Sequence, residues 1–354
     1  MTDLLNLTLP ELESWLAGLG EPRFRAAQLF QWLWRKGAAE FEAMTNLSKA
    51  LRGKLAETAA IVWPQVADTR VSSDGTVKLL LRLADGALVE TVLIPEEDHL
   101  TQCLSSQVGC PMACAFCSTG AGGFTRNMTA GEMAAQILVA RRRLKDQGRD
   151  PKDLRNLVFM GMGEPLLNLA ELLRALAVIT HDQGLGFSTR RATVSTCGLP
   201  GPMRQLGASG LASLAVSLHA PTQELRARLM PRAAAAAPLD ELMPALRDYP
   251  LTPRQRITIE YVLLAGVNDA PEHARQLVRL LSGLKCKVNL IAYNPSPDLP
   301  FAAPSPEAVL AFEKILWDKG MTAVLRKSKG SDISAACGQL RAAHLGKSDD
   351  PQQG

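Results

Sequence analysis

The 354-residue sequence has few aromatic residues, five histidines and almost no net charge. Phe, Trp and Tyr make up 5% of the chain, and the formal charge is +4. Such a small charge does not establish a nucleic-acid partner, although it permits local basic patches. Charges or prolines interrupt every apolar stretch of membrane length, and the first residues lack the pattern of a secretory signal. We therefore expect a cytoplasmic protein without a membrane partner.

The cysteine count argues against a disulfide scaffold. Seven cysteines is an odd number, and in a reducing compartment they indicate ligands or catalytic thiols. With 47% hydrophobic and 21% charged residues, the chain has the composition of a globular protein. Its length suits one large domain and a small one.

Three of the cysteines, Cys110, Cys114 and Cys117, stand in a C-x3-C-x2-C spacing within a glycine-rich stretch. A structural zinc site normally takes four protein ligands. A cubane iron–sulfur cluster held by three cysteines instead leaves one iron free to bind another molecule. The spacing favours the cluster, while a zinc site and a coincidental trio remain open.

Residues 1–62 predict a small module of three helices. Apolar faces recur in stretches 9–16, 24–34 and 41–56, and Pro10 stands near the start of the first. Basic residues such as Arg35 and Lys36 lie among aromatic ones, a mixture that suits RNA contact. Aromatic residues at helical spacing are equally typical of a core. We expect an accessory domain that binds RNA.

The stretch 63–98 predicts a β-meander. Its strands are expected at 66–71, 77–83 and 88–94, separated by the turn signals Asp74-Gly75 and Asp85-Gly86. Glu90 falls inside the last strand. The pattern alone favours a glutamate on the exposed face of an edge strand.

The segment 99–345 alternates strands with helices, which indicates parallel strands joined by right-handed crossovers. Capping-box patterns at Thr129–Glu132 and Asn168–Glu171 begin two of the helices. The fold class is therefore α/β, a partial (β/α)6 barrel, and residues 346–354 are expected to be a disordered tail. The six strands are expected at 104–108, 157–160, 192–195, 212–217, 257–264 and 288–292.

In a parallel barrel the active site lies at the carboxyl ends of the strands. Five of the expected strands run into a polar or glycine-rich turn at this end, a coincidence that indicates a site. These turns hold the three-cysteine loop, Gly161–Pro165, Ser195–Gly198, Ser217–His219 and Tyr293–Pro295.

Four motifs resemble a known family. They are Cys103-Leu-Ser-Ser-Gln-Val-Gly-Cys110-Pro-Met-Ala-Cys114-Ala-Phe-Cys117, Gly161-Met-Gly-Glu-Pro-Leu-Leu-Asn168, Ser217-Leu-His-Ala-Pro221 and Asp332-Ile-Ser-Ala-Ala-Cys337-Gly-Gln-Leu. Together they resemble the radical-SAM adenosine C2 methyltransferases of ribosomal and transfer RNA. The resemblance runs from the first helices to about Leu340, and the last motif is its most specific part.

The resemblance implies a cofactor site. Cys110, Cys114 and Cys117 would hold a [4Fe-4S] cluster whose open iron chelates S-adenosylmethionine (SAM). Gly163 and Glu164 would bind the methionine end, with the carboxylate pairing with the amine. The remaining cofactor-binding residues would be Ser195, Ser217, Leu218, His219 and Asn294.

The same resemblance implies three catalytic residues. Cys337 would carry the methyl group, Glu90 would remove the C2 proton, and Cys103 would attack Cys337 to release the product and leave a disulfide. Two SAM molecules would be used per turnover. The implied partners are 23S rRNA, tRNA and an electron donor such as a flavodoxin or ferredoxin system. We expect a monomer.

Three other functions stay open at this point. They are methylation of adenine at C8, a radical-SAM maturase or activase, and a non-catalytic zinc protein that binds RNA. The longer N-terminal module and the Gly161–Asn168 motif favour C2 over C8. Cys197 and Cys286 are expected in the core. The basic stretches Arg141–Lys145 and Arg326–Lys329 are either phosphate contacts or solvated faces.

Overall fold

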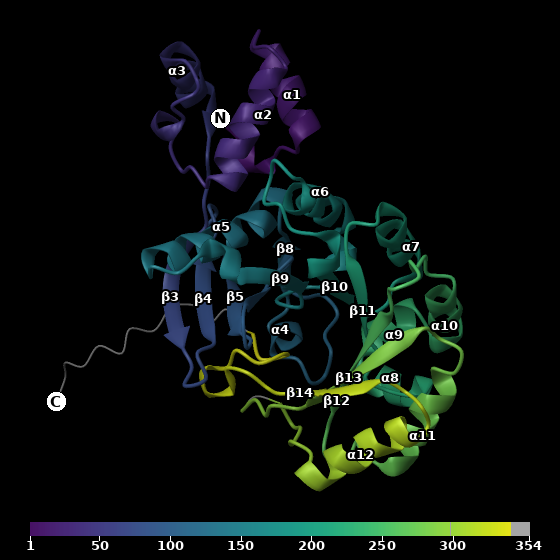
Figure 1. Ribbon diagram of the computed structural model, residues 1–354. Helices are drawn as coiled ribbons and strands as arrows, with labels where there is room; N and C mark the ends of the chain where they lie inside the picture. Colours follow the sequence, from purple (N-terminus) through teal and green to yellow (C-terminus); the bar gives the residue numbers. More distant parts are fainter. Residues whose placement is uncertain (298, 341–354) are drawn as a thin grey trace, which may run out of the picture.

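The computed structural model describes residues 1–297 and 299–340 of the chain. The predicted tail 346–354, and the last five residues of the predicted barrel segment, lie outside these described residues. A curved ten-stranded sheet dominates the fold, and helices α5, α6, α7, α10, α11 and α12 surround its outer side (Figure 1).

The order of the strands in this sheet is β14-β13-β12-β11-β10-β9-β6-β5-β4-β3. Strands β6 and β9 to β14 are parallel, and β3 to β5 add to one edge as an antiparallel meander. The strands are β3 (Gln65–Val71), β4 (Val77–Arg82), β5 (Leu88–Pro95), β6 (Leu100–Cys103), β9 (Leu154–Phe159), β10 (Ala192–Thr196), β11 (Ser213–Ser217), β12 (Ile257–Leu263), β13 (Cys286–Ala292) and β14 (Ala323–Arg326).

Crossover helices connect the parallel strands, as the alternating pattern predicts. Their apolar faces pack on the sheet, and the residues they bury there, such as Leu176 and Phe312, are fully inaccessible to solvent. The helices of this part are α4 (Ser118–Ala121), α5 (Ala130–Asp146), α6 (Leu169–Thr180), α7 (Pro200–Ser209), α8 (Gln223–Leu229), α9 (Pro231–Ala236), α10 (Leu239–Arg247), α11 (Pro271–Leu280) and α12 (Pro306–Asp318).

The α/β class, the meander and the parallel barrel are confirmed, and two details of the sheet are wrong. The first barrel strand is β6, before the predicted stretch 104–108, and β14 is a seventh parallel strand that the pattern did not predict. The stretch 104–108 holds the polar residues Ser105, Ser106 and Gln107, whose hydrogen bonds lead the chain out of the sheet. Its end forms β7 (Gln107–Gly109), which pairs with β8 (Phe124–Asn127) in a separate ribbon.

One predicted helix cap is present and the other is absent. The Thr129 hydroxyl accepts from the Glu132 amide, and the Glu132 carboxylate accepts from the Thr129 amide, which completes the capping box of α5. Asn168 does not cap α6, because its side-chain amide donates to the carbonyls of Ser106 and Met128 instead. Asn168 therefore ties the start of α6 to the turn that precedes the cysteine loop.

The N-terminal module contains β1 (Thr2–Asp3), α1 (Leu9–Gly18), α2 (Phe24–Phe30), α3 (Lys49–Thr58) and β2 (Ala59–Ala60). A π-helical turn over residues 31–35 continues α2. The third helix starts at Lys49 rather than near 41, because the Ser48 hydroxyl caps it by accepting from the Leu51 amide. The bounds of the domains stay a prediction.

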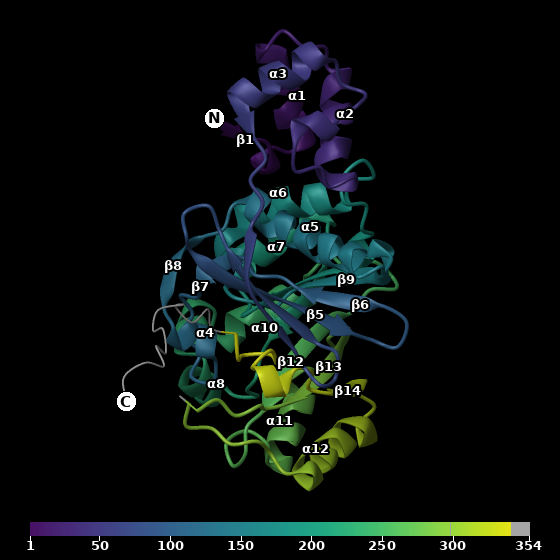
Figure 2. The same cartoon turned by 90° about the vertical axis from the view of Figure 1, so that its left-hand side faces the viewer.

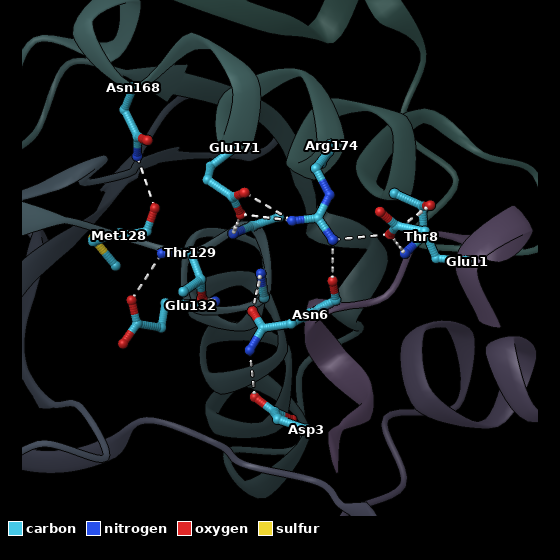
Figure 3. Close-up of polar contacts among 12 residues, drawn as sticks. Asp3, Asn6, Thr8, Glu11, Met128, Thr129, Glu132, Asn168, Glu171 and Arg174 are labelled. Carbon is cyan, nitrogen blue, oxygen red and sulfur yellow. Dashed lines mark hydrogen bonds and ion pairs between the residues drawn. The ribbon is translucent and has the colours of Figure 1, made fainter. Parts of the chain in front are cut away.

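A polar network fixes the module to the barrel (Figure 3). The Arg174 guanidinium on α6 donates to the Asn6 carbonyl, to Glu11 and to Glu171. Glu171 also accepts from the Ala130 amide at the start of α5. A Cβ on Gly131 would lie 2.7 Å from the Leu5 carbonyl, so glycine permits the close approach of the two parts. This network therefore joins the first residues of the module to the start of α5 and to α6.

None of the helices in the described part of the chain combines the length and apolar character that a membrane span requires.

Candidate active site

A cavity opens at the carboxyl ends of β9 to β12, where the barrel pattern predicts a site. The predicted site residues in its lining come from five separate stretches of the chain. The predicted site residues that line it are Cys110, Cys114, Cys117, Gly163, Glu164, Ser195, Ser217, His219 and Cys337.

Four predicted residues lie outside this lining. Leu218 is fully buried, and its amide donates to the Glu260 carbonyl. Asn294 lines a second cavity together with Arg326 and Cys337, and its side-chain amide donates to the Ser328 hydroxyl at 2.9 Å. Glu90 and Cys103 lie on the paired strands β5 and β6. Because Cys337 lines both cavities, it stands where the two meet.

Backbone hydrogen bonds hold the cysteine loop in place. Gly109 has φ 77°, and a Cβ there would lie 2.1 Å from the Gly123 carbonyl oxygen, so only glycine allows the loop to close. The Cys110 amide donates to that same oxygen at 2.7 Å. At the other end, the Ser118 amide donates to the Gly338 carbonyl at 2.8 Å. The loop that presents the three thiols is thus bonded to the residue after Cys337.

The donor set fits a thiolate-bound cluster. Burial raises the pKa of Cys110 to about 12 and also raises the pKa of Cys114, and the neighbouring thiols act in the same direction. A bound cation reverses such shifts, since a coordinating thiol loses its proton. Within residues 1–297 and 299–340, no three His, Cys, Asp or Glu side chains are gathered as the ligands of a single metal ion. The three thiols instead line a shared cavity.

Glu164 is a buried carboxylate beside these thiols. Its two oxygens accept from the amides of Leu166 and Cys197, at 3.0 and 2.8 Å. Burial nevertheless raises its pKa. Gly163 has φ 107°, and a Cβ there would lie 2.6 Å from Gln107 Cβ. Glycine at position 163 therefore allows the backbone before Glu164 to pack against Gln107. A cationic group in the cavity would stabilise the charged form of the Glu164 carboxylate.

His219 is a neutral hydrogen-bond donor in this cavity. Burial lowers its pKa to about 3, and the Arg226 charge acts in the same direction. Its Nδ1 accepts from the Val262 amide at 3.0 Å, which leaves the proton on Nε2. The Phe116 ring packs edge-on against the imidazole at 5.0 Å between ring centroids. The ring is held in one orientation by protein contacts alone.

The structure corrects the exposed, edge-strand interpretation of Glu90. Strand β5 is interior, because it pairs with β4 and β6, and Glu90 is only 4% exposed. Its Oε1 lies 3.0 Å from Lys78 Nζ, and its Oε2 has no hydrogen-bond partner among the described residues. A buried carboxylate with one free oxygen suits a proton acceptor.

Cys103 and Cys337 are neighbouring free thiols. Burial and, to a smaller extent, the neighbouring Cys337 thiol raise the pKa of Cys103 to about 12, and burial also raises the pKa of Cys337. The Arg326 guanidinium opposes the rise in both. Cys337 is an exposed residue on the loop after β14, whereas Cys103 is buried at the end of β6. The pair thus combines one accessible thiol with one inaccessible thiol.

Of the two cysteines expected in the core, Cys197 is 4% exposed and Cys286 is half-buried. Cys197 also lines the cavity, and its amide holds Glu164. Its carbonyl accepts from the fully buried Arg226 at 2.8 Å.

Sequence reasoning missed Lys78, Arg226 and Glu260. Glu260 lines the cavity; its Oε1 accepts from Asn289, its Oε2 has no partner among the described residues, and burial raises its pKa. The available signal was a charged residue inside an apolar strand, as in Ile-Thr-Ile-Glu260-Tyr-Val-Leu and Val-Lys78-Leu-Leu-Leu. Burying a charged side chain costs free energy unless a partner compensates the charge, so such a residue indicates a buried ion pair or a functional site.

Two family models match separate parts of the chain. Residues 2–61 match the ribosomal RNA large subunit methyltransferase N-terminal domain. Residues 104–278 match the radical SAM superfamily.

Curated relatives match almost the whole chain. The dual-specificity RNA methyltransferase RlmN of Nitratidesulfovibrio vulgaris (strain DSM 19637 / Miyazaki F) is 62% identical, over 98% of this chain and 95% of its own length. The protein of the same name from Geobacter sulfurreducens is 50% identical, over 96% of this chain and 92% of its own length.

A solved structure has the same fold. The crystal structure of a radical SAM methyltransferase from Sphaerobacter thermophilus matches with a TM-score of 0.91 and 46% identity, and covers 97% of this chain and all of that one. This agreement extends over the N-terminal module, the meander and the barrel. The chain therefore belongs to the RlmN family of dual-specificity RNA methyltransferases, within the radical SAM superfamily.

Proposed function

We propose that the protein methylates C2 of adenosine in 23S rRNA and tRNA, with Cys337 as the methyl carrier. The observation that carries the proposal is one cavity lined by three cysteines, a buried carboxylate and Cys337. Membership of the family supports an RNA methyltransferase that depends on SAM. The choice of C2 rests on the sequence motifs.

The residues present suit a cluster and SAM. Cys110, Cys114 and Cys117 would hold a [4Fe-4S] cluster, and Gly163 and Glu164 would bind the methionine end of SAM. When bound, these groups supply the methyl carbon and the radical chemistry that an unactivated adenine C2 requires. Ser195, Ser217, Leu218, His219 and Asn294 are proposed as the remaining cofactor contacts, with His219 donating from Nε2.

The chain's own groups would then complete the transfer. Cys337 is accessible enough to carry a methyl group and reaches both cavities. Glu90 would accept the C2 proton at its free oxygen. Cys103, as its thiolate, would attack the Cys337 sulfur, so that a sulfur–sulfur bond forms and the bond from sulfur to the transferred carbon breaks. The electron pair of the broken bond would stay on that carbon, which takes up a proton and becomes the methyl group on C2. The resulting disulfide requires an outside reductant before the next turnover.

Nucleoside mass spectrometry tests the reaction and its carbon. RNA from cells that lack this protein should lose 2-methyladenosine, and the wild-type gene should restore it. Separate digestion of the 23S rRNA and tRNA pools shows which of them is modified. Unchanged 2-methyladenosine together with missing 8-methyladenosine would assign the enzyme to C8 instead.

Anaerobic reconstitution tests the cofactor. The purified chain should bind about four irons, with the visible absorption of a cubane cluster, and Cys114→Ala should not. A colourless protein that holds zinc and no iron would support the zinc alternative. The same preparation allows the monomer and the flavodoxin or ferredoxin donor to be tested, by its mass in solution and by turnover with each donor.

The carrier thiol has a separate test. Cys337→Ala should retain the iron content and SAM binding of the wild type, because Cys337 is not a proposed cluster ligand. It should transfer no methyl group to RNA. Full turnover by this variant would contradict the carrier role while leaving the cofactor site intact.

A further inference from the structure

Two basic stretches that are far apart in the sequence meet at the junction between the N-terminal module and the barrel. Arg35 and Lys36 follow α2, whereas Arg141, Arg142 and Lys145 lie on α5. All five line one hollow together with Trp34 and Trp63, and we call these seven residues the junction cleft. Figures 1 and 2 both place the end of the module against α5.

Close packing fixes the two sides of the junction cleft. A Cβ built on Gly37 would lie 3.7 Å from the Trp63 ring and 3.8 Å from Leu138 of α5, which are ordinary packing distances. Lys36 Nζ lies 3.5 Å from the centre of the Trp32 ring, and the Arg35 guanidinium donates to the Asp182 carbonyl. The cations are therefore held at the junction rather than spread through solvent.

The charges of the junction cleft are largely uncompensated. No acidic side chain lines it, and among the described residues only Arg142 of the five cations forms an ion pair, an exposed one with Asp146. Such exposed pairs contribute little. Five positive charges in one hollow repel one another, so binding an anion there is favourable.

Arg141 gives independent support, because it is a half-buried cation without an acidic partner among the described residues. Its Nη2 donates to the Leu185 carbonyl, its guanidinium packs on the Phe187 ring, and its Nε has no partner. Burial lowers its pKa to about 10. Buried charges in proteins are normally paired, so this one is suited to a counter-ion from outside the chain.

We propose that the junction cleft binds backbone phosphate groups of the RNA substrate, away from the catalytic cavity. This inference rests on the proposed function, which supplies the polyanion. Every nucleotide of an RNA carries a phosphate, so a substrate in the catalytic cavity presents further anions to the rest of the surface. The indole N–H groups of Trp34 and Trp63 are also buried without a partner among the described residues.

The test compares two triple variants that lose the same charge. One is Lys36→Gln/Arg142→Gln/Lys145→Gln, which removes three exposed cations of the junction cleft. The control is Arg275→Gln/Arg279→Gln/Lys314→Gln on α11 and α12, at the opposite end of the molecule (Figures 1 and 2). Binding of deproteinised tRNA and of 23S rRNA to the cluster-loaded chain is measured from about 50 to about 300 mM salt.

The junction-cleft variant should bind RNA at least about tenfold more weakly than the wild type at the lowest salt. The slope of log affinity against log salt should be smaller in magnitude by about 2. The control should retain the wild-type slope. Iron content and SAM binding should match the wild type in both variants, since neither alters the catalytic cavity. Equal slopes and affinities for the two variants would overturn the junction-cleft proposal. A wild-type chain that binds and methylates neither RNA would instead overturn the proposed function.

Discussion

Lys78 Nζ lies 3.0 Å from Glu90 Oε1, and the two side chains are 8% and 5% exposed. Because β4 and β5 are antiparallel, with Lys78 opposite Val92 and Leu80 opposite Glu90, the pair is a diagonal contact on one face of the sheet. Lys78 Nζ also donates to the Ser334 carbonyl, on the loop that carries Cys337. One ammonium group thus joins the proposed base to the carrier loop.

A double-mutant cycle should show that this pair is strongly coupled. Lys78→Met leaves an unpaired buried carboxylate and should lower the free energy of unfolding by about 3–5 kcal/mol. Lys78→Met/Glu90→Gln should be more stable than Lys78→Met alone, because no uncompensated charge remains. Urea unfolding of the four proteins measures the coupling. Additive losses would show that the two groups do not interact.

The two thiols of the proposed carrier pair should react at different rates, because Cys337 is an exposed residue and Cys103 is buried, although burial raises the pKa of both. Burial raises the pKa of Cys103 to about 12, so at any lower pH less than half of this thiol is the reactive thiolate. In the cluster-free protein, iodoacetamide should modify the exposed Cys337 first, and labelling of Cys103 should rise as the pH approaches 12. Peptide mass spectrometry measures both cysteines in one sample. Equal labelling of both at neutral pH would contradict the buried state of Cys103.

The barrel and most of the cavity were predictable because both depend on local pattern. Alternating strands and helices fix a parallel sheet, and this sheet gathers its polar turns at one end. Ser195, Ser217 and His219 were found by that rule. Strand β14 was missed because it has only four residues, Ala-Val-Leu-Arg, which do not alternate between apolar and polar side chains.

The polar interior was not predictable, because it depends on which distant residues meet. Glu90 alone looks like an exposed residue of an edge strand, and only the pairing of β5 with β6 buries it. Asn168 looks like a helix cap until the carbonyls of Ser106 and Met128, on either side of the cysteine loop in the sequence, accept from its amide. The local sequence shows a charged residue inside an apolar strand at Glu90, but it does not show which partner that residue or Asn168 meets.

Gly163→Ala should abolish SAM binding through the position of Glu164. The substitution has a backbone cost at φ 107°, and its Cβ would also meet Gln107 at 2.6 Å. Gly210→Ala is the matched control, since Gly210 has φ 63° and open space where a Cβ would lie. Both variants should lose stability, but only Gly163→Ala should fail to bind SAM in calorimetry after reconstitution. Normal binding by Gly163→Ala would show that the turn tolerates a side chain.

Arg174→Ala should loosen the N-terminal module, because it removes donors to the Asn6 carbonyl, Glu11 and Glu171 at once (Figure 3). Charged hydrogen bonds of this kind predict a loss of about 1–3 kcal/mol and faster protease cleavage between α3 and β3. Arg275→Ala is the matched control, because it removes an exposed ion pair with Glu272 that has the same three-residue spacing as Arg174 and Glu171. It should lower the free energy of unfolding by at most about 1 kcal/mol. Similar losses for both variants, with no change in cleavage, would mean that apolar packing alone holds the module on α5 and α6.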